Sequence, residues 1–154
     1  MSISIRKAKI NELKIIQDLN HDLFASDGPR DQFLNHEWPY EDGKKYFIKR
    51  MSEPNSICLV AIVDNQIIGY LAGELLKTES WRPVKRIELQ NMFVKDQFRN
   101  LGVGKKLVSE FLKWSKSKGV KKVLVVAYVT NQRAINFYEK SGFEPESLSL
   151  EANV

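Results

Sequence analysis

The chain has 154 residues, of which 43% are hydrophobic and 28% are charged, and its formal net charge is +5. This length suits one domain over residues 1–154, and this composition excludes an intrinsically disordered protein. No apolar run approaches the ~20 residues that a transmembrane helix needs, so we expect no membrane partner. The N-terminus lacks the apolar block of a signal peptide, and a single cysteine excludes an internal disulfide. These features predict a cytoplasmic protein.

Apolar and polar residues alternate over residues 2–9, which predicts a first strand. Asn11 is then expected to cap a helix with one apolar stripe that reaches Leu23. The stretch from Ala25 to Gly43 contains several Gly and Pro residues and predicts a long irregular connection. A second helix is expected over residues 44–51.

Two apolar strands are predicted over residues 57–63 and 67–75, and the residues between them carry a hairpin signal. Cys58 lies inside the first of these runs, without a charged neighbour that would activate it. We therefore expect a buried and inert thiol rather than a nucleophile.

The second half of the chain alternates strands and helices. Strands are expected over residues 86–94 and 121–129, the latter in the middle of a sheet because it is apolar on both faces. Helices are expected from Leu101 to Gly119 and from Asn131 to Gly142, and a last strand begins at Phe143. The fold class is therefore a mixed α/β sandwich of the α+β type in a single domain.

A glycine-rich turn, Arg99 to Lys105, lies between a predicted strand and a helix. Helix N-termini present free N–H groups to anions, and glycine lets a phosphate approach the backbone. The glycine spacing excludes a P-loop, and Leu107 occupies the position of the third glycine of a dinucleotide fingerprint. Two interpretations stay open at this point, a phosphate site and a purely structural turn.

Two motifs resemble the GCN5-related N-acetyltransferase (GNAT) family. The turn, with its preceding Phe98, is similar to the Arg/Gln-x-x-Gly-x-Gly/Ala signature of that family. Residues 131–143 resemble its Asn-x-x-Ala-x-x-Phe-Tyr-x-x-x-Gly-Phe segment. Asn100 departs from the glycine that is frequent after the arginine, a change expected to matter little because side-chain clashes are expected at Gly102 and Gly104.

The resemblance implies a mostly antiparallel central sheet, flanked by helices, in which the fourth and fifth strands splay apart. It also implies acetyl-CoA as the co-substrate, with the pantetheine arm between those strands and the pyrophosphate on the turn. The cofactor-binding residues would be Met92, Phe93, Val94, Arg99, Asn100, Leu101, Gly102, Val103, Gly104, Lys105 and Asn131.

The implied activity is N-acetyl transfer from acetyl-CoA to a primary amine in a ternary complex. Tyr138 matches the tyrosine that many members place near the thioester sulfur, so it is expected to protonate the thiolate, with core packing as the alternative. Glu88 is the candidate base and should share a strand face with Gln90 and Met92. Family acids lie nearer positions 90 and 91, which are amides here, so Glu88 would act through a water or remain an ordinary surface carboxylate.

The acceptor is expected to be a cationic amine, either a small molecule or a protein amino group. From Asn11 to Gly43 there are eight acidic residues against two basic ones, and aromatic residues in this region could stack on a cation. The predicted substrate-binding residues are Asp27, Asp31, Phe33, Glu37, Trp38 and Tyr40. No His, Cys and Asp spacing suggests a metal site.

Two other functions are compatible with the same sequence. A non-catalytic acyl-CoA-binding or sensor module is the first, since the amides at 90 and 91 replace acids. Nucleic-acid binding is the second, because the segment from Lys95 to Lys122 contains nine Lys or Arg residues and only two acidic ones. These lysines are interleaved with core-facing residues and lack stacking aromatics, so we expect no nucleic-acid partner. Family members are often homodimers, which the resemblance extends to this chain as an expectation.

Overall fold

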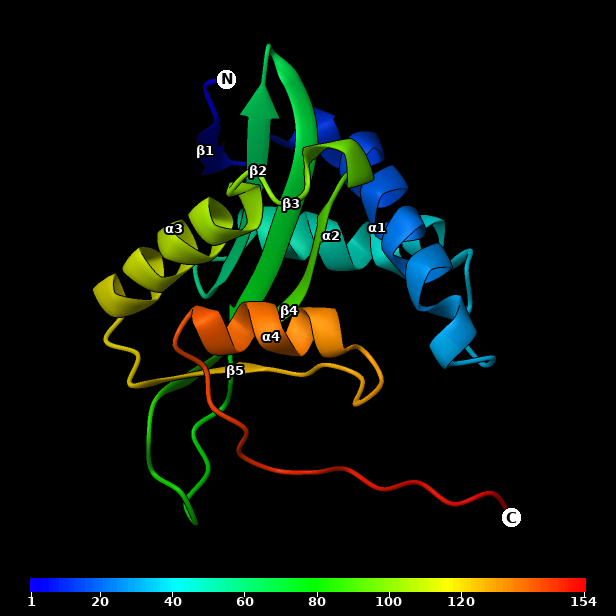
Figure 1. The fold of residues 1–154 in the computed structure, drawn as a ribbon. Coiled ribbons are helices and arrows are strands. Elements are labelled where there is room, and N and C mark those ends of the chain that lie inside the picture. The colour runs from blue at the N-terminus through cyan, green and yellow to red at the C-terminus, as the bar shows by residue number, and fades with distance from the viewer.

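The computed structural model describes every residue from Met1 to Val154. The strands are β1 (Ser4–Lys7), β2 (Ser56–Val63), β3 (Gln66–Leu75), β4 (Arg86–Val94) and β5 (Lys122–Val125). The helices are α1 (Leu13–Asp27), α2 (Asp42–Ser52), α3 (Val103–Ser117) and α4 (Gln132–Lys140). The strands form one sheet in the order β1-β2-β3-β4-β5, antiparallel except for the parallel β4–β5 pair. The mixed α/β architecture predicted from the sequence is confirmed (Figure 1).

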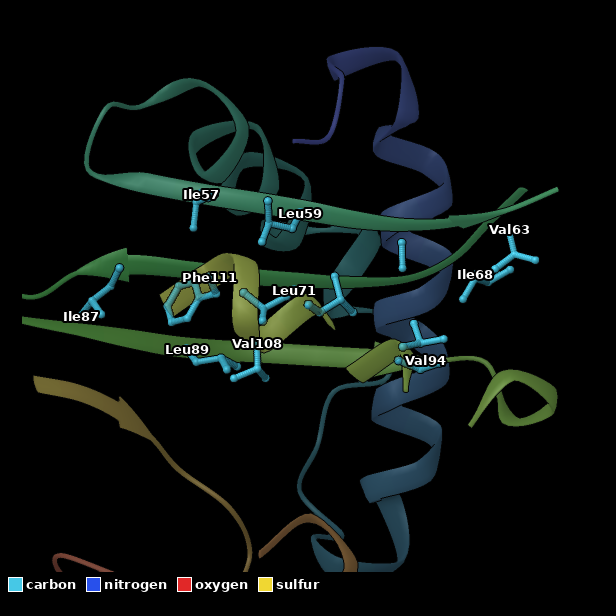
Figure 2. Packing of buried hydrophobic residues seen from close by; sticks show 13 residues of the cluster. Ile57, Leu59, Val63, Ile68, Leu71, Ile87, Leu89, Val94, Val108 and Phe111 are labelled. Atoms are coloured by element: carbon cyan, nitrogen blue, oxygen red, sulfur yellow. The ribbon is translucent and has the colours of Figure 1, made fainter. Parts of the chain in front are cut away.

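Helices cover both faces of this sheet (Figure 1). On one face, Val108 and Phe111 of α3 pack against alternating residues of β2, β3 and β4, as Figure 2 shows. On the opposite face, α1 and α2 pack through Ile16, Leu19 and Phe47 on the other set of strand residues. Each face of β2 and β3 is buried, which explains why these strands are almost continuously apolar.

The β2–β3 hairpin closes as its sequence predicts. Val63 pairs with Gln66, and the two residues between them, Asp64 and Asn65, have φ of 48° and 62°. Two positive φ values in a two-residue loop match the turn type that twists with the strands, and Asn and Asp tolerate this conformation. Cys58 lies buried in β2, and burial raises the pKa of its thiol to about 12, so it stays protonated and inert.

The start of the first helix differs from expectation. A short 3-10 turn over Ile10–Glu12 precedes α1, and Asn11 lies inside it rather than capping the helix. Glu12 takes the N-cap position of α1 without a side-chain cap, while its carboxylate accepts a hydrogen bond from the Lys9 N–H at 2.8 Å at the start of the 3-10 turn and pairs with Arg6. None of the helices combines the length and the hydrophobicity that a membrane-spanning segment needs.

Two predictions at the C-terminal end of the chain are wrong. Residues from Phe143 onward form no strand, and β5 ends at Val125 instead of Val129. Without a sixth strand, β5 is an edge strand with half-buried residues rather than the middle of the sheet. Pro145 lacks an N–H donor and so interrupts strand pairing directly after α4.

A β-bulge in β4 changes which side chains share a face. Ala72 pairs with Asn91 and Gly73 with Leu89, so Gln90 is the extra residue of the bulge. Met92 beyond the bulge packs on the α3 side, while the Gln90 and Asn91 side chains both contact α2. The expectation that Glu88 shares a face with Met92 is therefore wrong, because simple alternation does not hold across a bulge.

Candidate functional site

The loop before α3 presents a row of free backbone donors. None of the N–H groups from Asn100 to Lys105 donates a hydrogen bond within the chain; the first to do so is that of Lys106, to the Gly102 carbonyl at 3.1 Å. Asn100 and Gly102 adopt positive φ values of 62° and 85°, which curl the loop around these donors. Free amides in such a curl, at the positive end of a 15-residue helix, are an arrangement that can bind an anion.

The two glycines of this loop are needed for different structural reasons. A Cβ on Gly102 would meet no atom within 4 Å, so this position needs glycine for its left-handed backbone rather than for space. A Cβ on Gly104 would lie 3.1 Å from Phe137 Cζ, so this glycine lets α4 pack against α3. The expected side-chain clash at Gly102 is not found within the chain. Asn100 tolerates its positive φ, as this residue type often does.

Arg99 braces the loop against the end of β4. Its Nε donates to the Val94 carbonyl at 2.9 Å, its Nη1 lies 3.0 Å from Asp96, and its guanidinium lies over the Phe93 ring. Lys105 in contrast is exposed and makes no ion pair, which leaves its charge available beside the free amides. Of the two charged residues predicted to bind the cofactor, Arg99 therefore makes its contacts within the protein, and only Lys105 has a free charge.

The backbone of β4 is open where β5 leaves it. β5 pairs with β4 only from Arg86 to Leu89, while β3 continues to pair with β4 as far as Val94. The Lys95 N–H donates to the Ile68 carbonyl at 2.9 Å, and antiparallel ladders alternate in direction, so the peptide groups of Met92 and Val94 face the gap. The predicted splay of the fourth and fifth strands is confirmed.

Tyr138 on α4 packs against the core cluster on the α3 side of the sheet. Its ring is half-buried between Phe137 and Phe143, at centroid distances of 5.1 and 5.5 Å, and its hydroxyl makes no hydrogen bond within the chain. Burial raises the pKa of Tyr138 to about 12, so the phenol stays protonated at neutral pH. An uncommitted phenol of this kind can donate a proton or a hydrogen bond.

Asn131 stabilises the start of α4. It is the N-cap of α4, and its Oδ1 accepts a hydrogen bond from the Ala134 N–H at 3.2 Å. This cap sets the start of the helix that carries Tyr138. Its predicted contact with the pantetheine arm stays a prediction.

A polar network that sequence reasoning missed joins α2 to the bulge of β4. Tyr46 Oη and Arg50 Nε both donate to Gln90 Oε1, at 2.5 and 2.7 Å, and Asn91 Nδ2 donates to Tyr46 Oη at 2.9 Å. Arg50 also pairs with Glu74 at 2.8 Å while being 7% exposed. The Asn91 Oδ1 atom is buried and accepts no hydrogen bond. The i, i+4 spacing of Tyr46 and Arg50 on α2 is the signal that could have indicated a shared face.

Glu88 lies apart from this network. It pairs in register with Glu74, it is half-buried, and it makes no hydrogen bond or ion pair. The register places it on the same face of the sheet as Glu74, on the side of α2 and two residues before the bulge. Its carboxylate therefore has no side-chain partner, and it lies on the opposite face of the sheet from Met92.

The connection between α1 and α2 approaches the loop after β5. Tyr128 Oη donates to Asp31 Oδ2 at 3.3 Å, which joins this connection to the loop after β5. Asp27 lies 3.3 Å from Arg30, and its pKa is raised mainly by burial. Glu37 remains two-thirds exposed, at 3.9 Å from His21. Asp31 and Glu37 make no ion pair with Lys or Arg, so they leave the connection a negative charge.

The predicted aromatic residues of this connection have unequal environments. Trp38 stacks on Phe24 at 5.7 Å and packs against the α1/α2 core, so it is a structural residue. Tyr40 donates to Asp18 at 2.6 Å and has Lys14 over its ring. Phe33 is 79% exposed and alone offers a free aromatic surface.

Comparison with known proteins gives a consistent picture. The sequence pattern of the acetyltransferase (GNAT) family matches residues 15–143. A spermidine N(1)-acetyltransferase of Thermoplasma acidophilum is 22% identical over 153 residues, 95% of this chain and 91% of that protein. An N-alpha-acetyltransferase of Sulfurisphaera tokodaii is 28% identical over 117 residues, 72% of this chain and 68% of that protein.

A solved structure shares the whole fold. The crystal structure of PaiA N-acetyltransferase from Thermoplasma acidophilum in complex with coenzyme A superposes with a TM-score of 0.80 at 22% identity. The match covers 97% of this chain and 94% of that chain. The sheet with its parallel β4–β5 pair is therefore found in a protein that was crystallised with coenzyme A.

Proposed function

The chain belongs to the acetyltransferase (GNAT) family, and we propose that it transfers acetyl from acetyl-CoA directly to a primary amine of a cationic acceptor in a ternary complex. Acetyl-CoA is the co-substrate of this family. The observation that carries the proposal is the row of six free N–H groups from Asn100 to Lys105, next to the open edge of β4. A pyrophosphate would find its donors in the former, and a pantetheine amide would find backbone partners in the latter.

The reaction at the thioester has three parts that protein groups can assist. The amine nitrogen attacks the carbonyl carbon, the carbonyl oxygen becomes an oxyanion, and the carbon–sulfur bond breaks to release the thiolate. The Met92 N–H, which faces the gap, would stabilise the oxyanion, a contact worth roughly 3 kcal/mol of barrier. Tyr138, whose raised pKa keeps the phenol protonated, would protonate the thiolate. The nitrogen is positively charged after the attack, and its release of a second proton would restore the phenol.

The amine must first lose a proton. An alkyl ammonium has a pKa near ~10.4, so only about one molecule in a thousand is uncharged at pH 7. Glu88, free of hydrogen bonds, is the proposed base and would act through a water because it precedes the bulge. Asn91 Oδ1, buried and without a donor, would accept an N–H of the incoming amine and hold its lone pair toward the thioester.

The acceptor is proposed to be a small polyamine-like or aminoglycoside-like cation. Asp27, Asp31 and Glu37 supply the negative potential, and the exposed ring of Phe33 supplies a surface for a cation. The name of one relative, a spermidine acetyltransferase, supports this class, and the name of the other leaves an N-terminal amino group as the protein alternative.

Release of free thiol from acetyl-CoA, with a panel of amines, tests the proposal. The panel should hold spermidine, an aminoglycoside, a peptide with a free N-terminus and neutral alcohols as controls. We expect thiol release with one of the cationic amines and an acetylated product of the matching mass. Saturable binding of acetyl-CoA without turnover on any amine would contradict the transferase and favour a non-catalytic acyl-CoA-binding module.

A further inference from the structure

Two side chains of α2 reach the bulge of β4. Tyr46 Oη donates a hydrogen bond to Gln90 Oε1 at 2.5 Å and accepts one from Asn91 Nδ2 at 2.9 Å. Gln90 is the extra residue of the bulge and Asn91 follows it, so a single hydroxyl joins the two side chains. Arg50 Nε donates to the same Gln90 oxygen at 2.7 Å. The bulge is therefore held to one helix by three hydrogen bonds.

Arg50 also connects α2 to the two neighbouring strands. Its Nη1 donates to Ser56 Oγ of β2 at 3.3 Å and pairs with Glu74 of β3 at 2.8 Å. The guanidinium lies 4.4 Å from the centre of the Tyr46 ring, and the residue is 7% exposed. Burial of a charge carries a desolvation cost that can exceed the gain from its ion pair, so a buried pair is a poor source of net stability. What these contacts fix is the position of α2 relative to β2, β3 and the bulge.

The bulge sets the direction of the peptide groups that follow it in β4. Leu71 pairs with Met92 beyond the bulge, and the Met92 N–H faces the gap left by β5. If Gln90 entered regular pairing with β3, the rest of β4 would shift by one residue, and such a shift turns each later residue to the opposite face. The Met92 N–H would then point at β3, and the Asn91 side chain would turn from α2 toward α3. The donor in the gap therefore depends on Gln90 remaining outside the β3–β4 ladder.

We propose that Tyr46 and Arg50 are positioning residues for acetyl transfer, which hold Gln90 in the bulge and so keep the Met92 N–H directed at the gap. This inference rests on the proposed function, in which that N–H stabilises the oxyanion. Neither α2 side chain is hydrogen-bonded to the loop before α3. Loss of either should therefore lower the rate of the chemical step more than the affinity for acetyl-CoA.

Tyr46→Phe removes the hydroxyl and keeps the ring. We expect kcat to fall at least about tenfold, with KM for acetyl-CoA changed by less than about twofold, because a misplacement of roughly 1 Å at the reacting groups can cost about a hundredfold in rate. Tyr70→Phe is the matched control. It removes another buried hydroxyl that accepts from an asparagine amide, that of Asn20 at 2.7 Å, but one that does not contact the bulge. Its kcat should stay within about twofold of the parent chain.

Arg50→Met combined with Glu74→Gln tests the second contact. The added glutamine avoids an unpaired carboxylate, and Glu74→Gln alone is the control because it keeps the Arg50 contact with Gln90. The double variant should show the same fall in kcat at nearly constant KM for acetyl-CoA, and the control should not. Arg50 makes no hydrogen bond with Asn91, so this pair tests the bulge without removing a partner of the proposed amine acceptor.

Nuclear magnetic resonance of the same proteins without ligand measures the register independently of turnover. The parent chain and both controls should show close contacts between Ala72 and Asn91, and rapid exchange of the Met92 amide, which has no partner in the gap. In Tyr46→Phe and in the Arg50 double variant, the contacts should weaken and the exchange should slow as the Met92 N–H turns to β3.

An unchanged register in both of these variants would overturn the proposal, whatever their activity. An equal loss of kcat in the Tyr70→Phe and Glu74→Gln controls would overturn it as well, since any loss of a buried polar contact would then have the same effect. A parent chain that releases no thiol with any amine would contradict the proposed function instead. The register measurements alone would then decide whether Tyr46 and Arg50 hold the bulge.

Discussion

The two halves of the candidate site are built by different means. On the acetyl-CoA side, the donors are backbone groups, namely the six free amides of residues 100–105 and the open edge of β4. On the amine side, the candidate groups are side chains in two sets, one between α2 and β4 and one between the α1–α2 connection and the loop after β5. The backbone side can serve any chain with this fold, whereas the side-chain side can distinguish one amine from another.

This difference predicts how mutations will act. Changes on the backbone side should alter the binding of acetyl-CoA whatever the amine, and changes on the side-chain side should alter turnover in a way that depends on the amine. Substitutions at Tyr138, Asn91, Gly102 and the carboxylates of the α1–α2 connection test this difference.

Tyr138→Phe should have the largest effect. Removal of a general acid costs typically 10²-fold or more in turnover, while the ring packing between Phe137 and Phe143 is kept. The measurements are kcat and the midpoint of thermal unfolding. Because the pKa of Tyr138 is about 12, the phenol is protonated below that pH, and at pH 9 about one molecule in a thousand is ionised. We therefore expect no alkaline fall in kcat from this group up to pH 9. Unchanged turnover in the variant would remove Tyr138 from catalysis.

Asn91→Leu should lower kcat/KM by roughly tenfold to a hundredfold, because an N–H of the amine would lose its acceptor. Asn20→Leu is the matched control, since Asn20 also donates through Nδ2 to a tyrosine hydroxyl, at 2.7 Å, and also has a buried, unpaired Oδ1. Both variants should lose stability. Only the Asn91 variant should also lose activity under conditions in which both proteins remain folded. Equal activities in the two would show that Asn91 only supports the fold.

Gly102→Ala should cost about 1 kcal/mol of stability, because its φ of 85° disfavours any side chain although space is open. Gly119→Ala is the control at the other end of α3, with φ of 75° and no atom closer than 4.0 Å to the added carbon. Denaturant unfolding should show similar losses for the two. Only the first should weaken acetyl-CoA in calorimetric titration, and an equal affinity in both variants would argue against the phosphate role of the loop.

Neutralising Asp31 and Glu37 should have the smallest effect, a few-fold rise in KM for a polycation, since exposed charges contribute about 0.2–1 kcal/mol each. Asp27→Asn should raise KM less than neutralising Asp31 or Glu37 does, because the charge of Arg30 already offsets the Asp27 carboxylate. Steady-state kinetics at low and high salt would measure this, and the rise should shrink as salt increases. A KM that is indifferent to all three changes would place the acceptor elsewhere.

The features that could be predicted from the sequence are mostly those of the backbone, namely the strands, the glycine turn and the splay. Strong periodic signals gave the strands β2, β3 and β4 to within one residue of their ends, because alternate burial on two faces fixes their composition. The glycine turn and the splay were predicted from local spacing and from the resemblance. The reason for Gly104 was not predictable, since it lies in contact with Phe137, which is 33 positions away in the chain.

The errors share a physical cause, which is that a strand depends on neighbours the local pattern does not specify. The run 147–151 alternates like a strand, yet it has no partner within its own chain. The bulge at Gln90 is invisible in the sequence of β4 because it arises from the register with β3. For the same reason the network of Tyr46, Arg50 and Asn91 appeared only once α2 was placed against β4.

Amide hydrogen exchange of residues 100–105, with and without acetyl-CoA, measures whether the loop before α3 binds the cofactor. These six N–H groups have no partner within the chain, so they should exchange rapidly in the free protein. We predict that acetyl-CoA slows their exchange and that of Met92, while ATP and NAD at the same concentration do not. Exchange at residues 100–105 that stays fast at saturating acetyl-CoA would show that the loop is a structural turn and does not bind the cofactor.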